Sequence, residues 1–224
     1  MAVPTDELSL DAADRCFDGA PAEEIIAWAA ERFGDGLVLA SSFNDCVLID
    51  LVARVSPQVT VMFLDTQYHF AETLQYVQQV QDRYGLRMEI LRPLTAPDNL
   101  WRSEPDGCCA ARKVEPLGRA LRNRTAWMSG LRRSEADTRA SAPVVSWDSR
   151  WQVVKVNPIV AWSDEDVEAY KRERSLPEHP LTAQGYRSIG CWPCTRPTSA
   201  DEDARAGRWS GSPKLECGLH AAAS

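Results

Sequence analysis

The chain of 224 residues is long enough for one domain with a small appendage, and its 44% hydrophobic content suffices for a sizeable core. The formal net charge of -7 argues against a protein built to coat nucleic acid or an anionic membrane, so any anion site must be local. Residues 1–20 have neither a basic start nor an apolar run, so neither a signal peptide nor a membrane span is expected. These features predict a cytoplasmic protein.

Short apolar runs alternate with segments of helical periodicity from residue 22 to residue 174. Strands are predicted at residues 37–40, 59–64, 86–91, 125–128 and 151–156. Helices are predicted at residues 22–33, 47–55, 69–84, with Phe70, Leu74, Val77 and Val80 on one face, and 163–174, with Ser163 as N-cap. This β-α-β alternation predicts an α/β fold whose mostly parallel sheet is covered on both faces.

Two polar loops follow predicted strands, at the sheet edge where α/β proteins bind ligands. The first, residues 41–45, contains Ser41 and Ser42 and precedes a helix whose free amides suit a phosphate or sulfate. Its plainer interpretation is an ordinary N-cap provided by Ser or Asn. The second, residues 129–139, carries three arginines, including Arg132 and Arg139. Arginines on loops are commonly solvated, so this loop alone does not define a site.

Seven cysteines in a chain without an export signal do not indicate a disulfide framework, because cytosolic thiols are kept reduced. Cys16 and Cys46 stand alone in apolar surroundings and are predicted to pack as small hydrophobes. Two pairs suit tetrahedral zinc or an iron–sulfur cluster: Cys108 and Cys109, then Cys191 and Cys194. The tandem first pair departs from the spaced pairs of zinc ribbons. It favours a four-iron four-sulfur cluster over zinc, with unliganded thiols as the third alternative, and Lys113 would place a positive charge nearby.

The seventh cysteine, Cys217, lies near the chain end, where segments commonly fray. It is therefore either idle or reactive, and reactivity depends on access and on neighbouring positive charge. His220 would favour its thiolate or simply pack, whereas Glu216 would disfavour the thiolate. After Pro177 the composition shifts to Pro, Gly, Arg and Trp and hydrophobic periodicity is lost, which predicts a loop-rich extension.

Several motifs are spaced along the chain. They are Leu-Asp-Thr (64–66), Tyr-His-Phe-Ala-Glu-Thr (68–73), Cys-Cys-Ala-Ala-Arg-Lys-Val-Glu-Pro-Leu (108–117), Gly-Leu-Arg-Arg with Thr-Arg (130–139), Gly-Cys-Trp-Pro-Cys (190–194), Glu-Asp-Xaa-Arg-Ala-Gly-Arg-Trp (202–209) and Glu-Cys-Gly-Leu-His (216–220). Their combination and order resemble the iron–sulfur assimilatory adenylyl-sulfate reductases of the phosphoadenylyl-sulfate reductase family. The resemblance implies the adenine nucleotide alpha hydrolase-like layered α/β fold, in agreement with the alternation above.

The resemblance implies one 4Fe-4S cluster on the two cysteine pairs. Relatives that reduce the 3′-phosphorylated substrate generally lack these cysteines, so adenosine 5′-phosphosulfate is the implied substrate. The implied mechanism begins when the Cys217 thiolate attacks the sulfate sulfur; AMP leaves and an S-sulfocysteine remains. Thioredoxin or a similar thiol reductant then releases sulfite. The tail that carries Cys217 would be a mobile arm that visits both partners.

Substrate contacts are implied where the chain matches the family motifs. The serines at the end of the first strand would face the phosphate, and Leu-Asp-Thr would lie near the adenosine. The lysine and the arginines would neutralise the sulfate and phosphate groups. The implied substrate-binding residues are Ser41, Ser42, Leu64, Asp65, Thr66, Lys113, Gly130, Arg132, Arg139, Arg205 and Arg208. We expect residues 1–176 to form the nucleotide-binding α/β part with the first cysteine pair. Residues 177–224 would add the second pair and the mobile catalytic tail, within a single domain overall.

Two departures from the family pattern stand out: a shortened loop at Asn44 and Asp45, and Gln67 in place of a glycine after Leu-Asp-Thr. The alternative functions are a 3′-phosphoadenosine 5′-phosphosulfate reductase and a non-catalytic, zinc-stabilised binding module. An ATP pyrophosphatase of the same fold is disfavoured, because Ser-Gly-Gly-Xaa-Asp-Ser is absent after the first strand. No feature of the sequence indicates an oligomeric state.

Overall fold

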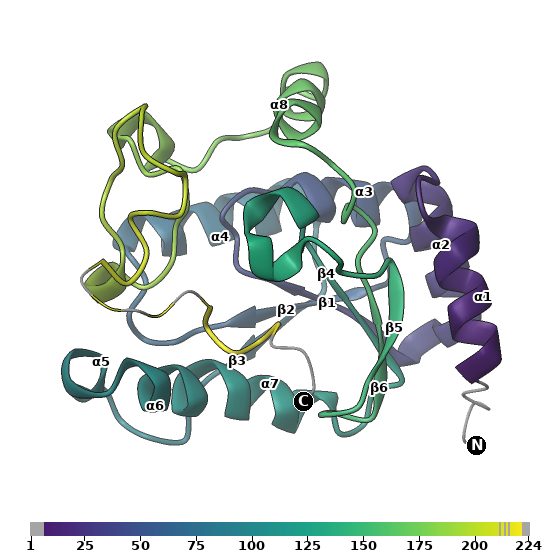
Figure 1. The fold of residues 1–224 in the computed structure, drawn as a ribbon, viewed down its shortest axis with the longest axis horizontal. Coiled ribbons are helices and arrows are strands. Elements are labelled where there is room, and N and C mark those ends of the chain that lie inside the picture. The colour runs from purple at the N-terminus through teal and green to yellow at the C-terminus, as the bar shows by residue number, and fades with distance from the viewer. Residues whose placement is uncertain (1–6, 211, 213, 215, 221–224) are drawn as a thin grey trace.

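The computed structural model describes residues 7–210, 212, 214 and 216–220, with helices on both sides of a central sheet (Figure 1). Within these residues the sheet has six strands in the order β3-β2-β1-β4-β6-β5. The parallel strands are β1 (Leu37–Ser41), β2 (Thr60–Leu64), β3 (Met88–Leu91), β4 (Ala126–Ser129) and β6 (Val153–Val156). The edge strand β5 (Val145–Asp148) pairs antiparallel with β6. The predicted α/β fold with a mostly parallel sheet is confirmed.

All five predicted strands are present, and the differences lie at their ends. The strand predicted at residues 151–156 begins at Val153, because Gln152 has a φ of 56° and closes the turn from β5. A backbone in the left-handed region cannot continue a strand. The sequence does not predict β5, whose only fully buried residue is Val145. An edge strand covered this sparsely lacks the continuous apolar run of a central parallel strand.

One face of the sheet is covered mainly by long amphipathic helices (Figure 1). They are α1 (Glu7–Phe17), which lies against β5, α2 (Ala22–Phe33), α3 (Val47–Val55), α4 (Ala71–Tyr84) and α8 (Asp164–Glu173), which packs outside α3. Their apolar stripes contact alternate strand residues such as Leu39, Val61 and Met128. Ser163 caps α8 as predicted, because its hydroxyl accepts a hydrogen bond from the Asp166 N–H.

The other face is covered by one irregular helical segment. It consists of α5 (Leu100–Ser103), α6 (Pro105–Cys109), the π-helical turn η2 (Ala110–Val114) and α7 (Glu115–Leu121). Leu117 and Leu121 pack against Trp127 and other sheet residues in a second core cluster. A π-helical turn inside a helix commonly marks a functional site, and here it follows the first cysteine pair directly. No described helix is long and apolar enough to cross a membrane.

Three local predictions are wrong. Cys16 is exposed, because the stripe of α1 that faces the core contains Leu10, Ala13 and Phe17 and position 16 lies off that stripe. Leu74 is 47% exposed, and α4 instead buries Thr73, Tyr76, Val77 and Val80. The N-cap that Ser or Asn is expected to provide before α3 is absent from the described residues. The Val47 N–H at the start of this helix instead donates to the Asp45 carboxylate over 3.0 Å. Cys46, by contrast, is buried as predicted.

The chain after α8 crosses α4 as loops and short 3-10 turns (yellow-green in Figure 1). The Pro177 carbonyl accepts a hydrogen bond from the Tyr76 hydroxyl over 2.8 Å, and the buried His179 lies 3.0 Å from the Thr73 hydroxyl. In the described part of residues 177–220, the turns η5 (Thr182–Gln184) and η6 (Trp192–Cys194) and one isolated bridge are the only regular elements. A division of the chain at residue 176 stays a prediction.

His179 should make the fold sensitive to acid. Its Nδ1 accepts from the Leu181 N–H and its Nε2 faces Thr73, so the buried ring is neutral, and burial lowers its pKa to about 4. Unfolded chains take up this proton near pH 6.5, so His179 contributes stability above that pH that is lost as the pH falls toward 4. We expect the urea midpoint to fall less between pH 7 and pH 5 in His179→Gln than in the unsubstituted protein. An equal fall in both would contradict this assignment.

Candidate active site

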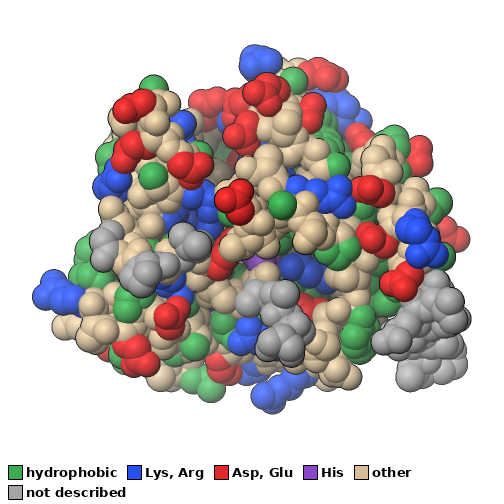
Figure 2. Space-filling view, viewed as in Figure 1, with side chains coloured by type: hydrophobic (Ala, Val, Ile, Leu, Met, Phe, Trp, Pro, Cys, Tyr) green, Lys and Arg blue, Asp and Glu red, His purple; other side chains and the backbone are tan. Residues whose placement is uncertain are grey.

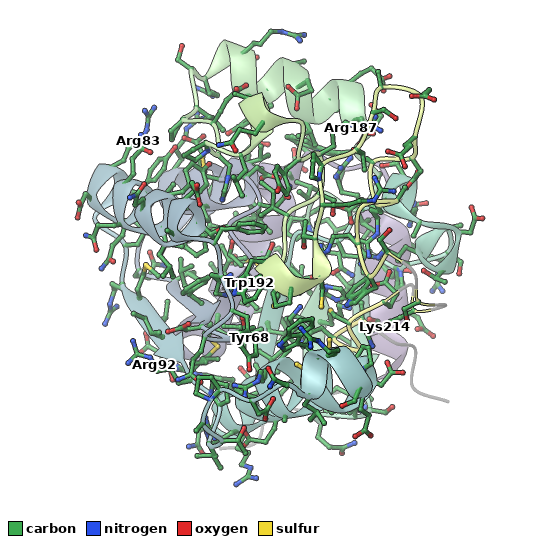
Figure 3. All side chains as sticks on the ribbon, turned by 90° about the vertical axis from the view of Figure 1, so that its left-hand side faces the viewer. Tyr68, Arg83, Arg92, Arg187, Trp192 and Lys214 are labelled. Atoms are coloured by element: carbon green, nitrogen blue, oxygen red, sulfur yellow. The ribbon has the colours of Figure 1, made fainter. Side chains whose placement is uncertain are left out.

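Four cysteines from two distant segments line one small cavity: Cys108, Cys109, Cys191 and Cys194. The first pair ends α6 and the second flanks η6. The Trp192 N–H donates to the Tyr68 carbonyl over 2.8 Å, which ties the second pair to the loop after β2. Figure 3 shows Tyr68 and Trp192 on the same side of the molecule. The other lining residues are Tyr68, Trp101, Pro105, Arg112, Lys113, Pro193, Arg208 and Trp209.

All four thiols are free, and the first pair is buried. Burial, followed by the neighbouring thiols, raises the pKa of Cys108 to about 11 and also raises the pKa of Cys194. Among the described residues, no three His, Cys, Asp or Glu side chains are grouped around a single metal-ion position. One zinc ion requires its sulfurs at about 2.3 Å, whereas a four-iron cluster takes one thiolate at each iron and spreads its ligands around a larger group.

Basic side chains face these thiols. Burial opposes the charge of Lys113, but the thiols of Cys191, Cys217 and Cys109 outweigh it and raise the pKa of Lys113. Burial and then the adjacent Arg205 lower the pKa of Arg208. The buried Arg208 Nε has no hydrogen-bond partner within the described part of the chain. A buried donor without a partner is costly, so this guanidinium is suited to an anion that enters the site.

The tail that carries Cys217 is held by ion pairs to Glu216. The Nε and Nη2 atoms of Arg139 each donate to a different oxygen of this carboxylate over 2.7 Å. The Arg205 Nη2 lies 3.4 Å from one of the oxygens, and the Thr138 hydroxyl lies 3.4 Å from the other. Because Arg139 is only 7% exposed and the pairing is bidentate, the contact is strong and directional. It fixes the residue directly before Cys217.

The residues after Cys217 are held too. The Gly218 carbonyl accepts from Arg150 Nη1 over 2.8 Å. The His220 ring stacks on Trp127, with centroids 5.9 Å apart and planes 3° from parallel, and Lys155 Nζ lies 3.2 Å from His220 Nδ1. In this structure the tail is therefore docked on both sides of the thiol, against β4 and β6.

This docking decides between the two roles considered for His220. Burial, reinforced by Lys155, Arg139 and Arg205, lowers the pKa of His220 well below its usual value, so the ring is neutral. A neutral ring that accepts a hydrogen bond from Lys155 Nζ does not act as a cation beside Cys217. His220 packs and anchors the tail. Glu216 is already neutralised by Arg139, so its charge opposes the Cys217 thiolate less than the sequence suggests.

The half-buried Cys217 lies among cations. Its neighbours include Lys113, Arg139 and Arg208, and also Lys155, whose pKa burial lowers to about 8. Figure 2 shows basic side chains in the hollow beside the C-terminal loops, with acidic side chains at its rim. Nearby positive charge favours a thiolate and also binds oxyanions. The arrangement is suited to a nucleophilic thiol that meets an anionic substrate.

The remaining predicted residues lie at the carboxyl edge of the sheet, after β1, β2 and β4. The Ser41 hydroxyl accepts from the Phe43 N–H, and Ser42 is exposed. Asp65 accepts from the Gln67 N–H and pairs with Arg92 at 3.1 Å. The remaining three of these residues are Leu64, Thr66 and Gly130; Thr66 is buried, with its hydroxyl 3.3 Å from the Cys191 sulfur.

One predicted cation is engaged elsewhere. Arg132 Nη1 donates to the Asp164 carboxylate at the start of α8 over 2.6 Å, and its Nη2 lies 3.6 Å from Glu135. Arg132 is not among the residues that line the cysteine cavity. Its guanidinium holds the arginine loop to α8.

Two basic residues that the sequence reasoning does not single out belong to the site. Arg112 is 1% exposed and lines the cysteine cavity, and Lys155 contacts the docked tail. Arg112 sits beside Lys113 in a matched motif, which is a signal that could have found it. Lys155 lies in the middle of β6 and nothing in its local sequence indicates the contact.

The fold and this site define a layered α/β protein with a cationic thiol centre next to a four-cysteine cavity. The phosphoadenosine phosphosulfate reductase domain model matches residues 36–197. The chain is 46% identical to an adenosine 5′-phosphosulfate reductase of Mycolicibacterium smegmatis over 209 residues, which covers 90% of this chain and 89% of the relative. It is 45% identical to one of Streptomyces coelicolor, over 96% of both chains.

Two solved structures have a fold similar to that of this chain. A phosphoadenylyl-sulfate reductase of Candida auris in a phosphate complex superposes with a TM-score of 0.77 at 26% identity, over 88% of this chain and all of that one. An FMN adenylyltransferase of Candida glabrata shares the fold alone, with a TM-score of 0.60 at 15% identity over 88% of this chain and 69% of that one. The chain belongs to the phosphoadenosine phosphosulfate reductase family, and the predicted adenine nucleotide alpha hydrolase-like fold is confirmed.

Proposed function

We propose that this protein reduces adenosine 5′-phosphosulfate to sulfite and AMP in sulfate assimilation. The observation that carries the proposal is the placement of the Cys217 thiol among Lys113, Arg139 and Arg208, beside the four-cysteine cavity. The relatives named adenosine 5′-phosphosulfate reductase, matched over 90% or more of this chain, supply the substrate class. We place the reaction in the cytoplasm, where free thiols are kept reduced.

The chemistry requires one nucleophile and a good leaving group. The Cys217 thiolate attacks the sulfate sulfur, the bond from that sulfur to the bridging oxygen breaks, and AMP leaves with the electron pair. A thiolate of thioredoxin or a similar reductant then attacks Cys217 Sγ. Sulfite leaves with the electron pair of the S–S bond, and a second reductant thiol resolves the mixed disulfide. Both electrons come from the reductant.

We assign distinct contacts with this substrate to residues of the described chain. Lys113, Arg205 and Arg208 would neutralise the phosphosulfate, because guanidinium forks suit tetrahedral oxyanions. The carboxyl-edge residues would hold the nucleotide: Ser41, Ser42, Leu64, Asp65, Thr66 and Gly130. Arg139 would act mainly through Glu216 on the tail. Arg132 has the weakest support, since it pairs with Asp164.

We propose that Cys108, Cys109, Cys191 and Cys194 hold one 4Fe-4S cluster. Four free thiols around one cavity with basic neighbours provide a suitable donor set. When bound, the cluster would supply local structure and an electrostatic field, since thiol chemistry accounts for both electrons. Purified under anaerobic conditions, the protein should contain about four iron and about four sulfide per chain. One zinc per chain in place of iron would contradict this assignment.

The substrate separates this function from its nearest alternative, reduction of 3′-phosphoadenosine 5′-phosphosulfate. With thioredoxin in excess, we expect the kcat/KM for sulfite release to be at least about a hundredfold higher for the substrate without the 3′-phosphate, because a site fitted to the smaller nucleotide leaves a buried dianion unpaired. Measuring both rates on one preparation tests the proposal. Preference for the 3′-phosphorylated substrate would overturn it.

A further inference from the structure

The loop after β2 holds a residue in an unfavourable backbone conformation. Gln67 has a φ of 66°, in the left-handed region where glycine is favoured and glutamine is not. The backbone N–H of Gln67 donates to the Asp65 carboxylate over 3.0 Å, a contact that glycine would also make. What distinguishes glutamine here is therefore its side chain.

That side chain contacts the most deeply buried guanidinium of the site. Gln67 Oε1 accepts a hydrogen bond from Arg112 Nη1 over 3.2 Å. Arg112 Nη2 donates to the Ala96 carbonyl over 2.6 Å and lies 3.2 Å from the Asp98 carboxylate. The guanidinium also faces the Tyr68 ring at 4.7 Å. Gln67 thus gives Nη1 its partner, while the other contacts hold the remaining parts of the group.

Arg112 is directed at the cysteine cavity. It lines the cavity together with the four cysteines, and its guanidinium brings a buried positive charge to them. The same loop contacts the second cysteine pair, because the Thr66 hydroxyl lies 3.3 Å from the Cys191 sulfur. The segment that follows β2 therefore touches both cysteine pairs, one directly and one through Arg112.

We propose that Gln67 is a positioning residue that fixes the Arg112 guanidinium as the counter-charge of the four-cysteine cavity. It acts through Arg112 and touches neither the substrate nor the thiols. The inference rests on the proposed function for the identity of the bound cluster, whereas the contact between Gln67 and Arg112 exists without metal.

The test compares two glutamines that both have a positive φ. Gln152 also has a positive φ, of 56°, but its side chain donates to the Ser149 carbonyl in the turn between β5 and β6. In iron-loaded protein, Gln67→Gly should release iron to a chelator about ten- to a hundredfold faster, since one hydrogen bond to a charged group is lost. Gln152→Gly should release iron at the unsubstituted rate. Gln67→Glu keeps an acceptor and should restore slow release.

Equal release from Gln67→Gly and the unsubstituted protein, or equal acceleration in Gln152→Gly, would overturn the proposal. A second measurement uses iron-free protein and compares the urea midpoints of Gln67→Gly, Arg112→Met and the double variant. We expect the effects not to add, because each change removes the same contact. Additive effects would refute the role of Gln67. Non-additive effects in a protein that binds no iron under any condition would leave the contact between Gln67 and Arg112 standing and refute only the cluster.

Discussion

Replacing Cys217 with serine should abolish sulfite formation while nucleotide binding remains. A serine hydroxyl is a far weaker nucleophile than a thiolate, and His220 Nδ1, which could accept the hydroxyl proton, instead faces Lys155 Nζ at 3.2 Å. We expect the rate of sulfite release to fall at least about a thousandfold, with the Kd for AMP changed by less than about threefold.

The matched control is Cys16→Ser, which changes an exposed cysteine on α1. It should retain the unsubstituted rate, so that loss of activity in Cys217→Ser reports the chemistry and not the removal of a thiol in general. A Cys217→Ser variant that still releases sulfite at a tenth of the original rate or faster would exclude Cys217 as the nucleophile.

Replacing Glu216 with glutamine should release the tail. Arg139 would lose the bidentate partner that docks the residue before Cys217, and only its pairing with Glu135 would remain. A charge-assisted contact of this kind contributes about 1.5–3 kcal/mol, so the equilibrium constant for docking of the tail falls about ten- to a hundredfold. We expect formation of the cysteine adduct in a single turnover to slow by a similar factor, and the free Cys217 thiol to react faster with iodoacetamide.

Glu202→Gln provides the control for this change. Glu202 also receives a bidentate ion pair, from Arg196 at 2.7 and 3.0 Å, in the same C-terminal extension. It does not line the cysteine cavity. Loss of that pair should leave adduct formation and thiol reactivity unchanged. If Glu216→Gln behaved like Glu202→Gln, the ion pair would not position the nucleophile.

The fold follows from features that are local in sequence. The strands at residues 37–41, 60–64 and 126–129 are continuous apolar runs because helices cover both of their faces, and α2 is bounded as its periodicity predicts. The sequence does not predict β5, because an edge strand needs few buried residues and so lacks a continuous apolar run. Strand direction alone predicts that the polar loops after β1 and β4 lie at the same edge of the sheet, because parallel strands end there.

The site is only partly predictable from the sequence, because its charged side chains form ion pairs with residues that are distant in the sequence. The two cysteine pairs come together as their spacing suggests. The sequence does not indicate that Glu216 would meet Arg139 across 77 positions, or that Arg132 would turn to Asp164. In the sequence, Gln67 stands out only because the family pattern has a glycine there. The role that we propose for its side chain depends on a contact with Arg112, 45 positions away.

The tail that carries Cys217 differs most from what the sequence predicts. Chain ends usually fray, which predicts an open arm, yet residues 216 and 218–220 make specific contacts on both sides of Cys217. This structure therefore describes the tail in a docked position, with Cys217 beside the cations that we propose bind the substrate. A reductant would have to reach Cys217 Sγ after these contacts open, so the docked tail would protect the intermediate from premature attack.

The most direct test is to incubate the protein with 35S-labelled adenosine 5′-phosphosulfate in the absence of any reductant and to locate the label by mass spectrometry of proteolytic peptides. The proposed chemistry predicts one sulfonate per chain on the peptide that contains Cys217, released as sulfite when thioredoxin is added. Label on any other residue, or sulfite release with no labelled protein, would contradict it.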